Sequence, residues 1–255
     1  MTVALHCRDS GGEGEAVLLA HAIGCDHRMW NDLTEALAPR YRVVAIDARG
    51  HGGSPVPARP YSLDAMADDV AALLDRLDVR RVHWVGLSMG GMIGQAFALR
   101  HGARLDRLVL ANTTASYGPG GRETWQARIR MVEEGGLGAI RDAVTARYFS
   151  DAFREKRPDV VAAVMGRFMQ TSPEGYLGCC DAIAELDFLP VLKDVAAPTL
   201  AIAGSADVGT PVAMSEAIVE RIPDARLAIL QGAAHLSAVE RPDEFAGIVS
   251  DFLGA

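Results

Sequence analysis

The chain carries a serine between two glycines, with an apolar segment on either side. Gly86-Leu87-Ser88-Met89-Gly90 follows the run Val82-His83-Trp84-Val85, and apolar residues continue at helical spacing over residues 92–99. Without its flanks, such a pentapeptide is equally typical of a plain turn. With them it predicts a buried strand, a tight turn and a helix, in which the serine hydroxyl points outward from the end of a sheet. We therefore expect an α/β sheet that presents a nucleophile at Ser88.

Short apolar segments alternate with helical patterns along most of the chain. Strands are expected at residues 16–20, 43–46, 82–85, 108–111, 199–203 and 227–230. Between them, apolar residues recur every three or four positions, as in residues 64–77 and in the last segment, which begins with Pro242. This alternation predicts a mostly parallel central sheet with helices on both faces.

The alternation is interrupted between about residues 118 and 189. This region holds helical patterns, one of which aligns Trp125 with Ile129, and its sequence contains no convincing strand. A helical insertion between two strands lies over the strand ends, where an open α/β sheet binds its ligand. We predict a core domain formed by residues 1–117 and 190–255, and a helical cap, or lid, formed by residues 118–189.

A serine hydroxyl needs a neighbouring base to act as a nucleophile, and the base needs a third group to orient it. Asp207 follows the fifth expected strand and His235 follows the sixth, so both lie on loops at strand ends. Taken singly, Asp207 is also typical of a turn with Gly209, and His235 of a structural loop histidine. Their order along the chain favours a shared catalytic site. In it His235 would accept the proton of Ser88, and Asp207 would orient His235.

Acyl transfer also needs backbone N–H groups that stabilise negative charge on the reacting oxygen. The residue after the nucleophile supplies one such group, the N–H of Met89. The loop after the first expected strand, His21-Ala22-Ile23-Gly24, supplies a second, which we assign to Ile23. The histidines and cysteines show no spacing typical of a metal site. We expect neither a metal ion nor an organic cofactor.

Composition and charge restrict the class of partner. Of the 255 residues, 49% are hydrophobic, and the net charge of −8 argues against nucleic acid as a partner. No apolar stretch is long enough to span a bilayer and the first residues lack a basic leader, so we expect a cytoplasmic protein without a membrane partner. Cys7, Cys25, Cys179 and Cys180 are expected to be free thiols. The oligomeric state stays open, a homo-oligomer included.

The chain resembles the α/β-hydrolase superfamily over nearly its whole length. The resemblance comes from the serine motif and from residues 21–24, 47–54, 204–211 and 235–242. It implies the α/β-hydrolase fold, a mostly parallel central sheet flanked by helices, with a helical cap inserted after the sixth strand. Esterases, carbon–carbon bond hydrolases and cofactor-free haloperoxidases share these motifs, so they do not identify a substrate.

More narrowly, the chain is similar to the 3-oxoadipate enol-lactonases of aromatic catabolism. This similarity is found in residues 86–92, 111–113, 123–128, 175–176 and 180–183. It implies a small lactone substrate with a free carboxylate, opened through an acyl-enzyme at Ser88. Trp125 and Arg128 share one face of an expected helix, and arginine can bind a carboxylate through two parallel hydrogen bonds. Alternatively, Trp125 belongs to the core of the cap and Arg128 is solvated.

One position departs from the enol-lactonase pattern. His21-Ala22 stands where those enzymes have Asn-Ser, which leaves the exact substrate open. The alternatives within the same class are a general carboxylesterase and a cofactor-free perhydrolase or haloperoxidase. An alternative from another class is a ligand receptor built on a hydrolase fold. In the enzymatic interpretations the partner is a small-molecule ester or lactone.

Overall fold

The central element of the protein is one twisted sheet. A computed structural model describes residues 1–254, and within them seven strands form this sheet in the order β1-β3-β2-β4-β5-β6-β7. The strands are β1 (Cys7–Asp9), β2 (Ala16–Ala20), β3 (Arg42–Ile46), β4 (Val82–Leu87), β5 (Leu105–Ala111), β6 (Thr199–Gly204) and β7 (Ala225–Leu230). β1 runs antiparallel to β3, and every other neighbouring pair is parallel. The predicted mostly parallel sheet is confirmed.

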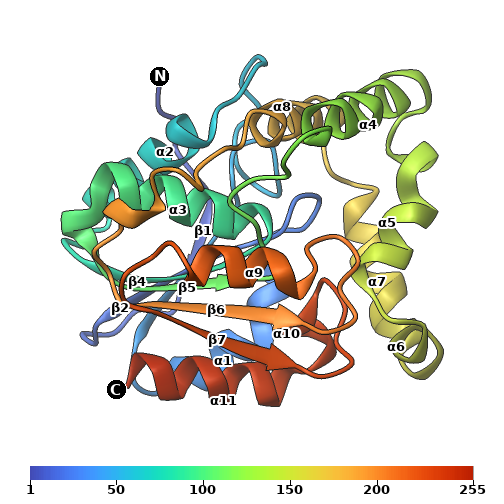
Figure 1. The fold of residues 1–255 in the computed structure, drawn as a ribbon. Helices are drawn as coiled ribbons and strands as arrows, with labels where there is room; N and C mark the ends of the chain where they lie inside the picture. Colours follow the sequence, from blue (N-terminus) through green and yellow to red (C-terminus); the bar gives the residue numbers. More distant parts are fainter. Residues whose placement is uncertain (255) are drawn as a thin grey trace.

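Helices cover both faces of the sheet (Figure 1). They are α1 (Asn31–Leu37), α2 (Leu63–Arg76), α3 (Met89–His101), α9 (Val212–Val219), α10 (Ser237–Glu240) and α11 (Pro242–Leu253), with 3-10 turns η1 (His27–Trp30), η2 (Gly102–Arg104) and η4 (Leu192–Asp194). Figure 1 shows α2, α3 and α9 on one face and α1 and α11 on the other. Strands covered on both sides have no solvent-facing side, which explains why β2 and β4 are apolar and buried at nearly every position.

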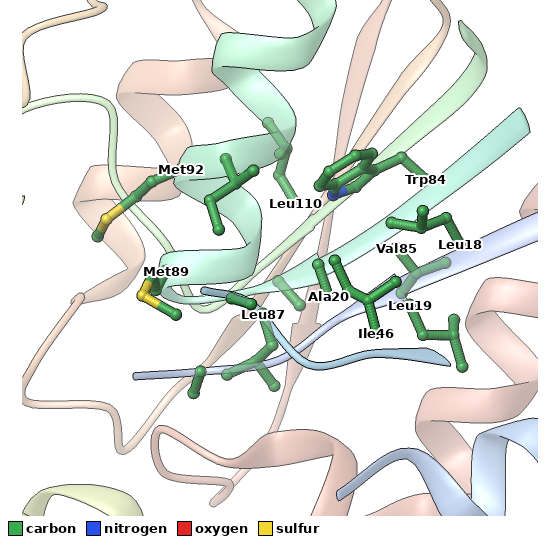
Figure 2. Packing of buried hydrophobic residues seen from close by; sticks show 14 of the residues in the cluster. Leu18, Leu19, Ala20, Ile46, Trp84, Val85, Leu87, Met89, Met92 and Leu110 are labelled. Carbon is green, nitrogen blue, oxygen red and sulfur yellow. The ribbon is translucent and has the colours of Figure 1, made fainter. Parts of the chain in front are cut away.

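The core is densest where α3 packs on β4 and β2. Figure 2 shows Trp84 of β4 between α3 and the aliphatic side chains of β2. The indole Nε1 donates to the carbonyl oxygen of Gly90, 3.1 Å away. A side chain at Gly90 would collide with the backbone of β2, and one at Gly94 would collide with Trp84. These glycines let the first turns of α3 approach the sheet closely, which fixes the position of the turn between β4 and α3.

Five helices separate β5 from β6, and they lie beyond the carboxyl ends of the strands. They are α4 (Gly121–Gly135), α5 (Arg141–Tyr148), α6 (Asp151–Lys156), α7 (Pro158–Phe168) and α8 (Pro173–Ala184), with the 3-10 turn η3 (Leu137–Ile140). In Figure 1 the arrows of β6 and β7 point toward α5 and α7. An isolated antiparallel bridge between Ser116 and Asp187 joins the two ends of this helical region. We refer to residues 118–189 as the cap.

Two details differ from the sequence-based expectation. The cap follows the fifth strand and not the sixth, because a single short strand, β1, precedes the parallel part of the sheet. β1 itself was not predicted, since it has three residues, two of them exposed, and therefore lacks an apolar pattern. Among residues 1–254 no helix has both the length and the apolar character needed to cross a bilayer.

Candidate active site

Ser88 lies in the turn between β4 and α3, with a backbone conformation that few residues other than glycine adopt. Its φ is 56°, so the turn is strained. The Ser88 N–H donates to the carbonyl oxygen of Ala111 at the end of β5 (2.9 Å), and the Thr113 hydroxyl donates to the carbonyl oxygen of Ser88 (2.8 Å). These two bonds to the neighbouring strand and loop hold the strained residue in place.

The loops after β6 and β7 bring Asp207 and His235 next to Ser88. The parallel register aligns the ends of β4 to β7, so the residues that follow them leave the sheet at one edge. His235 Nε2 lies 2.8 Å from Ser88 Oγ, and His235 Nδ1 lies 2.8 Å from Asp207 Oδ2. All three residues are buried. The structure thus assembles the three residues that the sequence motif selected, in hydrogen-bonded order.

Asp207 is held ionised by its hydrogen bonds. Its Oδ1 accepts the N–H groups of Gly209 (2.8 Å) and Thr210 (3.1 Å), and its Oδ2 accepts the Thr210 hydroxyl (2.7 Å). Burial alone would raise the pKa of Asp207, but the adjacent His235 and the hydrogen bonds lower it to about 2. An ionised carboxylate only accepts hydrogen bonds, so the proton of His235 lies on Nδ1 and the lone pair on Nε2 faces Ser88.

Asn112 connects the loops that carry Asp207 and His235. Its side-chain amide donates to Asp207 Oδ2 (2.9 Å) and to the carbonyl oxygen of Ala234 (3.2 Å), and its Oδ1 accepts the Ser237 hydroxyl (2.5 Å). Asn112 is fully buried and has a φ of 43°. The sequence analysis gave Asn112 no role in the site, although its place directly after a buried strand was an available signal.

The two N–H groups proposed for oxyanion stabilisation have no acceptor among residues 1–254. Met89 is the first residue of α3, where the helix dipole favours negative charge. Ile23 lies in the loop after β2, and its carbonyl oxygen accepts the Tyr148 hydroxyl from the cap. The next N–H, that of Gly24, donates to Nε2 of the buried His51 (2.8 Å). The hydrogen bonds of Tyr148 to Ile23 and of Gly24 to His51 fix the loop, and they leave the N–H of Ile23 free to bind a ligand.

Tyr148 of α5 is a contact that the sequence analysis missed. Its ring stacks on His235 with centroids 5.9 Å apart, while its hydroxyl reaches Ile23. The carbonyl oxygen of Tyr148 accepts the N–H of Leu236 (3.0 Å). The cap is therefore attached to the loop of His235 and to the loop of Ile23. Nothing in the sequence around Tyr148 distinguishes it from the other aromatic residues of the cap.

Trp125 and Arg128 lie side by side on α4, as their spacing predicts. The Arg128 guanidinium sits 4.9 Å from the centre of the Trp125 ring and donates to the Tyr176 hydroxyl (3.4 Å). Both residues line a cavity of about 350 Å³ that also includes Arg147 of α5 and Gly209. Ser88 and His235 are not among its lining residues, but Gly209, whose N–H donates to Asp207, is.

Two cations share this cavity without a carboxylate. No Asp or Glu among residues 1–254 forms an ion pair with Arg128 or lines the cavity, and the carboxylate of Asp207 acts on Arg147 only through its charge. Burial, and next the charge of Arg128, lower the pKa of Arg147. Half-buried like-charged groups repel each other, so an anion between them would be favoured. The sequence analysis missed Arg147 because this residue lies on α5 and not on α4. Helical spacing within α4 therefore could not relate it to Arg128.

Comparisons with known proteins bear on the family of the chain. A model of the alpha/beta hydrolase fold family matches residues 15–242. A 3-oxoadipate enol-lactonase 2 of Acinetobacter baylyi is 37% identical over 230 residues, which cover 90% of this chain and 85% of that protein. The crystal structure of an enol-lactonase from Burkholderia xenovorans LB400 superposes with a TM-score of 0.95, at 36% identity over 99% of this chain and 97% of that one.

A third similarity is to an esterase. The malate-bound structure of a thermophilic esterase from Thermogutta terrifontis has a TM-score of 0.93 and 30% identity, covering 98% of this chain and 93% of that one. The family match spans most of the chain and the relatives are aligned over most of their own length. By fold, by sequence and by the arrangement of its strand ends, the chain belongs to the α/β-hydrolase family.

Proposed function

We propose that the protein is a serine hydrolase that opens a small lactone bearing a carboxylate, and that the lactone is 3-oxoadipate enol-lactone. The observation that carries the proposal is the continuous chain from Ser88 through His235 to Asp207, with 2.8 Å at each step. The likeness to two enol-lactonases supports the choice of a lactone.

The reaction follows from the roles of these residues. Ser88 Oγ attacks the lactone carbonyl carbon while His235 Nε2 accepts its proton, and the N–H groups of Met89 and Ile23 stabilise the resulting oxyanion. The ring C–O bond then breaks, and the departing enol oxygen takes the proton from His235. The product at this stage is an acyl-enzyme on Ser88 whose enol converts to the ketone. Water, deprotonated by His235, attacks the ester and releases 3-oxoadipate.

The cavity beside Gly209 supports a substrate with a negative charge. The enol-lactone carries one carboxylate, and the ring-opened product carries two. Arg128 and Arg147 lack carboxylate partners within the described chain, and a guanidinium can bind a carboxylate through two parallel hydrogen bonds. We assign the substrate carboxylate to Arg128, with the Trp125 ring as the apolar wall beside it.

A carboxylesterase is the second candidate function, favoured by the likeness to the thermophilic esterase. It would use the same Ser88, His235 and Asp207 on a neutral ester. A receptor that binds a ligand without turning it over is the alternative outside the enzymes, and the hydrogen-bonded order of the three residues argues against it.

The test compares kcat/KM for 3-oxoadipate enol-lactone with kcat/KM for p-nitrophenyl acetate, using Ser88→Ala as the blank. We expect a large preference for the lactone that is lost in the variant. Activity on the neutral ester alone would retain the role of Ser88 and reject the enol-lactonase proposal. If neither substrate is hydrolysed in a Ser88-dependent way, the enzymatic proposal itself is wrong.

A further inference from the structure

Two histidines converge on one buried carboxylate, away from Ser88. His6 precedes β1, His27 begins η1 and Asp47 follows β3. His6 Nδ1 lies 2.8 Å from Asp47 Oδ2, and His27 Nδ1 lies 2.9 Å from Asp47 Oδ1. The two nitrogens and the carboxylate all lie within 4.8 Å of one another. Neither the proposed hydrolysis nor its substrate cavity uses these three residues.

The carboxylate in this cluster is fixed in place by the backbone. The Asp47 side chain has no solvent exposure, and its two oxygens accept the N–H groups of His27 (2.7 Å) and Gly53 (2.9 Å). These bonds hold the carboxylate in one orientation. A fixed anionic oxygen donor is one requirement of a metal site.

The backbone also leaves room for the two imidazole rings. A side chain at Gly52, which has a φ of 52°, would collide with the carboxylate of Asp47, and one at Gly53 would collide with the ring of His6. The backbone of His6 is fixed as well: its N–H donates to Ser54 Oγ (2.8 Å), and its carbonyl oxygen accepts the N–H of Asp47 (2.9 Å). The cluster is thus preorganised by contacts outside the three side chains.

One side of the cluster is open. His6, His27 and Asp47 line a cavity of about 310 Å³ whose other walls include Thr171 and Ser172 of the cap. Waters in this cavity would occupy the coordination positions that the three side chains leave free. The His6 side chain is 46% exposed and that of His27 is 18% exposed, so both rings can adjust toward an ion.

We propose that His6, His27 and Asp47 form a binding site for a divalent first-row transition metal ion, with Zn²⁺ as its representative. Ligands about 2.1 Å from a metal ion and at right angles are about 3.0 Å apart, close to the nitrogen–oxygen distances of 2.8 and 2.9 Å found here. In the tetrahedral arrangement that Zn²⁺ prefers, ligands are about 3.4 Å apart, so these contacts would lengthen slightly while the two ring nitrogens, which lie within 4.8 Å of each other, move together. Two imidazoles and one carboxylate select Zn²⁺, Ni²⁺, Co²⁺ or Cu²⁺ over Mg²⁺ and Ca²⁺.

Binding at Nδ1 places the ring proton on the opposite nitrogen. In the metal-free protein Nδ1 of each ring lies at hydrogen-bond distance from Asp47. With the ion bound, Nδ1 of His6 and of His27 gives its lone pair to the metal and the proton moves to Nε2, on the opposite side of the ring. The sequence analysis expected no metal because these ligands are separated by about twenty residues along the chain, and only the sheet brings them together.

The test measures Zn²⁺ binding to the chelator-treated protein by calorimetry and by competition with a chromogenic chelator. The variants are the single and double substitutions His6→Gln and His27→Gln. Loss of a residue that merely orients a ligand weakens metal binding about 10- to 100-fold, so loss of a ligand should exceed about 100-fold. His101→Gln is the matched control, because His101 is a half-buried histidine that bonds a single carboxylate, Asp68, at 2.8 Å.

We expect one equivalent of Zn²⁺ in the wild type and in His101→Gln, and none in the double variant. Binding that survives the double substitution, or that is lost in Cys7→Ser instead, would overturn the proposal. A second measurement needs no variant: among the seven histidines, Co²⁺ should broaden the imidazole NMR signals of His6 and His27 most strongly. Uniform broadening of all seven, or of another pair, would reject the site even if the variants fail to fold.

Discussion

The polar side chains at the strand ends all have hydrogen-bond partners, whereas the two arginines of the cap cavity have no carboxylate partner. At the strand ends, Ser88, Asp207 and His235 are buried and every one has a hydrogen-bond partner within 3 Å. In the cap cavity, Arg128 and Arg147 lie half-buried without a carboxylate. A buried network whose members are all satisfied is rigid, whereas an unpaired buried cation costs free energy unless a ligand neutralises it. Under the proposed function, the strand ends carry out the reaction and the cavity selects the substrate.

The two regions are also in physical contact through one helix of the cap, α5. Tyr148 belongs to the cap, yet its ring packs on His235 and its hydroxyl bonds Ile23. Arg147, its neighbour in α5, lines the selecting cavity and packs against Gly209, whose N–H bonds Asp207. One short helix of the cap therefore contacts the base, the loop of Ile23 and the cavity. Substitutions should still separate chemistry from selection, because the contacts come from different side chains.

The largest effect is expected for Ser88→Ala. Removing the nucleophile should lower kcat by at least about 10⁴-fold for the lactone and for p-nitrophenyl acetate alike, because both require the same acyl-enzyme. Steady-state rates with freshly purified variant measure this, and circular dichroism confirms that the fold is retained. If activity were lost on one substrate only, the other substrate would not react through Ser88. The proposed division between a reacting region and a selecting region would then be wrong.

Asn112→Gly should produce the next largest loss. Glycine keeps the φ of 43° without strain but removes the amide that holds Asp207 and the acceptor of the Ser237 hydroxyl. Loss of hydrogen bonds to a buried ionised group costs about 1–3 kcal/mol, so we expect unfolding free energy to fall by that amount and kcat to fall about 10-fold. Urea denaturation and kinetics measure both. An unchanged kcat would mean that Asp207 needs no support from Asn112.

Arg128→Ala and Arg147→Ala should each affect the lactone alone. A charge-assisted hydrogen bond contributes about 1.5–3 kcal/mol, which corresponds to a loss of about 10- to 100-fold in kcat/KM for a substrate with a carboxylate. Hydrolysis of p-nitrophenyl acetate should change less than about 2-fold, since no charge is bound.

Arg122→Ala is the matched control for the cap arginines. Arg122 is also on α4, but it is exposed and pairs with Glu185 at 2.9 Å, so its removal should leave both substrates unaffected. Arg128→Lys should restore part of the lost activity if charge is what matters. Equal losses on the lactone and the neutral ester would instead indicate that the cap is misfolded.

The candidate catalytic residues at the strand ends could be predicted from the sequence, but the residues that line the cavity could be predicted only in part. Ser88 and Asp207 follow buried strands and His235 follows the edge strand β7, and a parallel sheet aligns strand ends whatever the intervening chain does. The cap has no such rule. Its helices pack through irregular contacts, so the spacing of Trp125 and Arg128 within α4 could be predicted, but the approach of Arg147 from α5 could not.

The same reason explains the cluster around Asp47 and the support given by Asn112. Both depend on side chains brought together over long sequence separations: His6 meets Asp47 across 41 residues, and Asn112 meets Asp207 across 95. Periodicity along the chain carries information about elements but none about such pairs. The edge strand β1 was missed for a simpler reason, since a short exposed segment has no apolar pattern.

The smallest predicted effect is a dependence of folding stability on pH. It arises from His51, behind the loop of Ile23, and not from the arginines of the cap cavity. Burial, and next the neighbouring His21, lower the pKa of His51 to about 3, so the unfolded chain, with a histidine pKa near 6.5, binds more protons than the folded one below that value. Stability should therefore decrease as the pH falls from about 6.5 toward 3, by about 1 kcal/mol over the first pH unit. Below about pH 4, Asp207 adds to the loss, because its folded pKa is about 2.

The measurement is Tm as a function of pH between 8 and 4, in the wild type and in His51→Gln. Glutamine can still accept the N–H of Gly24 but does not titrate, so its curve should be flatter than that of the wild type between pH 6.5 and 5. The cap arginines stay charged over this range, so acid should weaken the loop behind Ile23 before it changes the charge of the cavity. A slope unchanged in His51→Gln would assign the acid sensitivity to another group and remove this difference between the two regions.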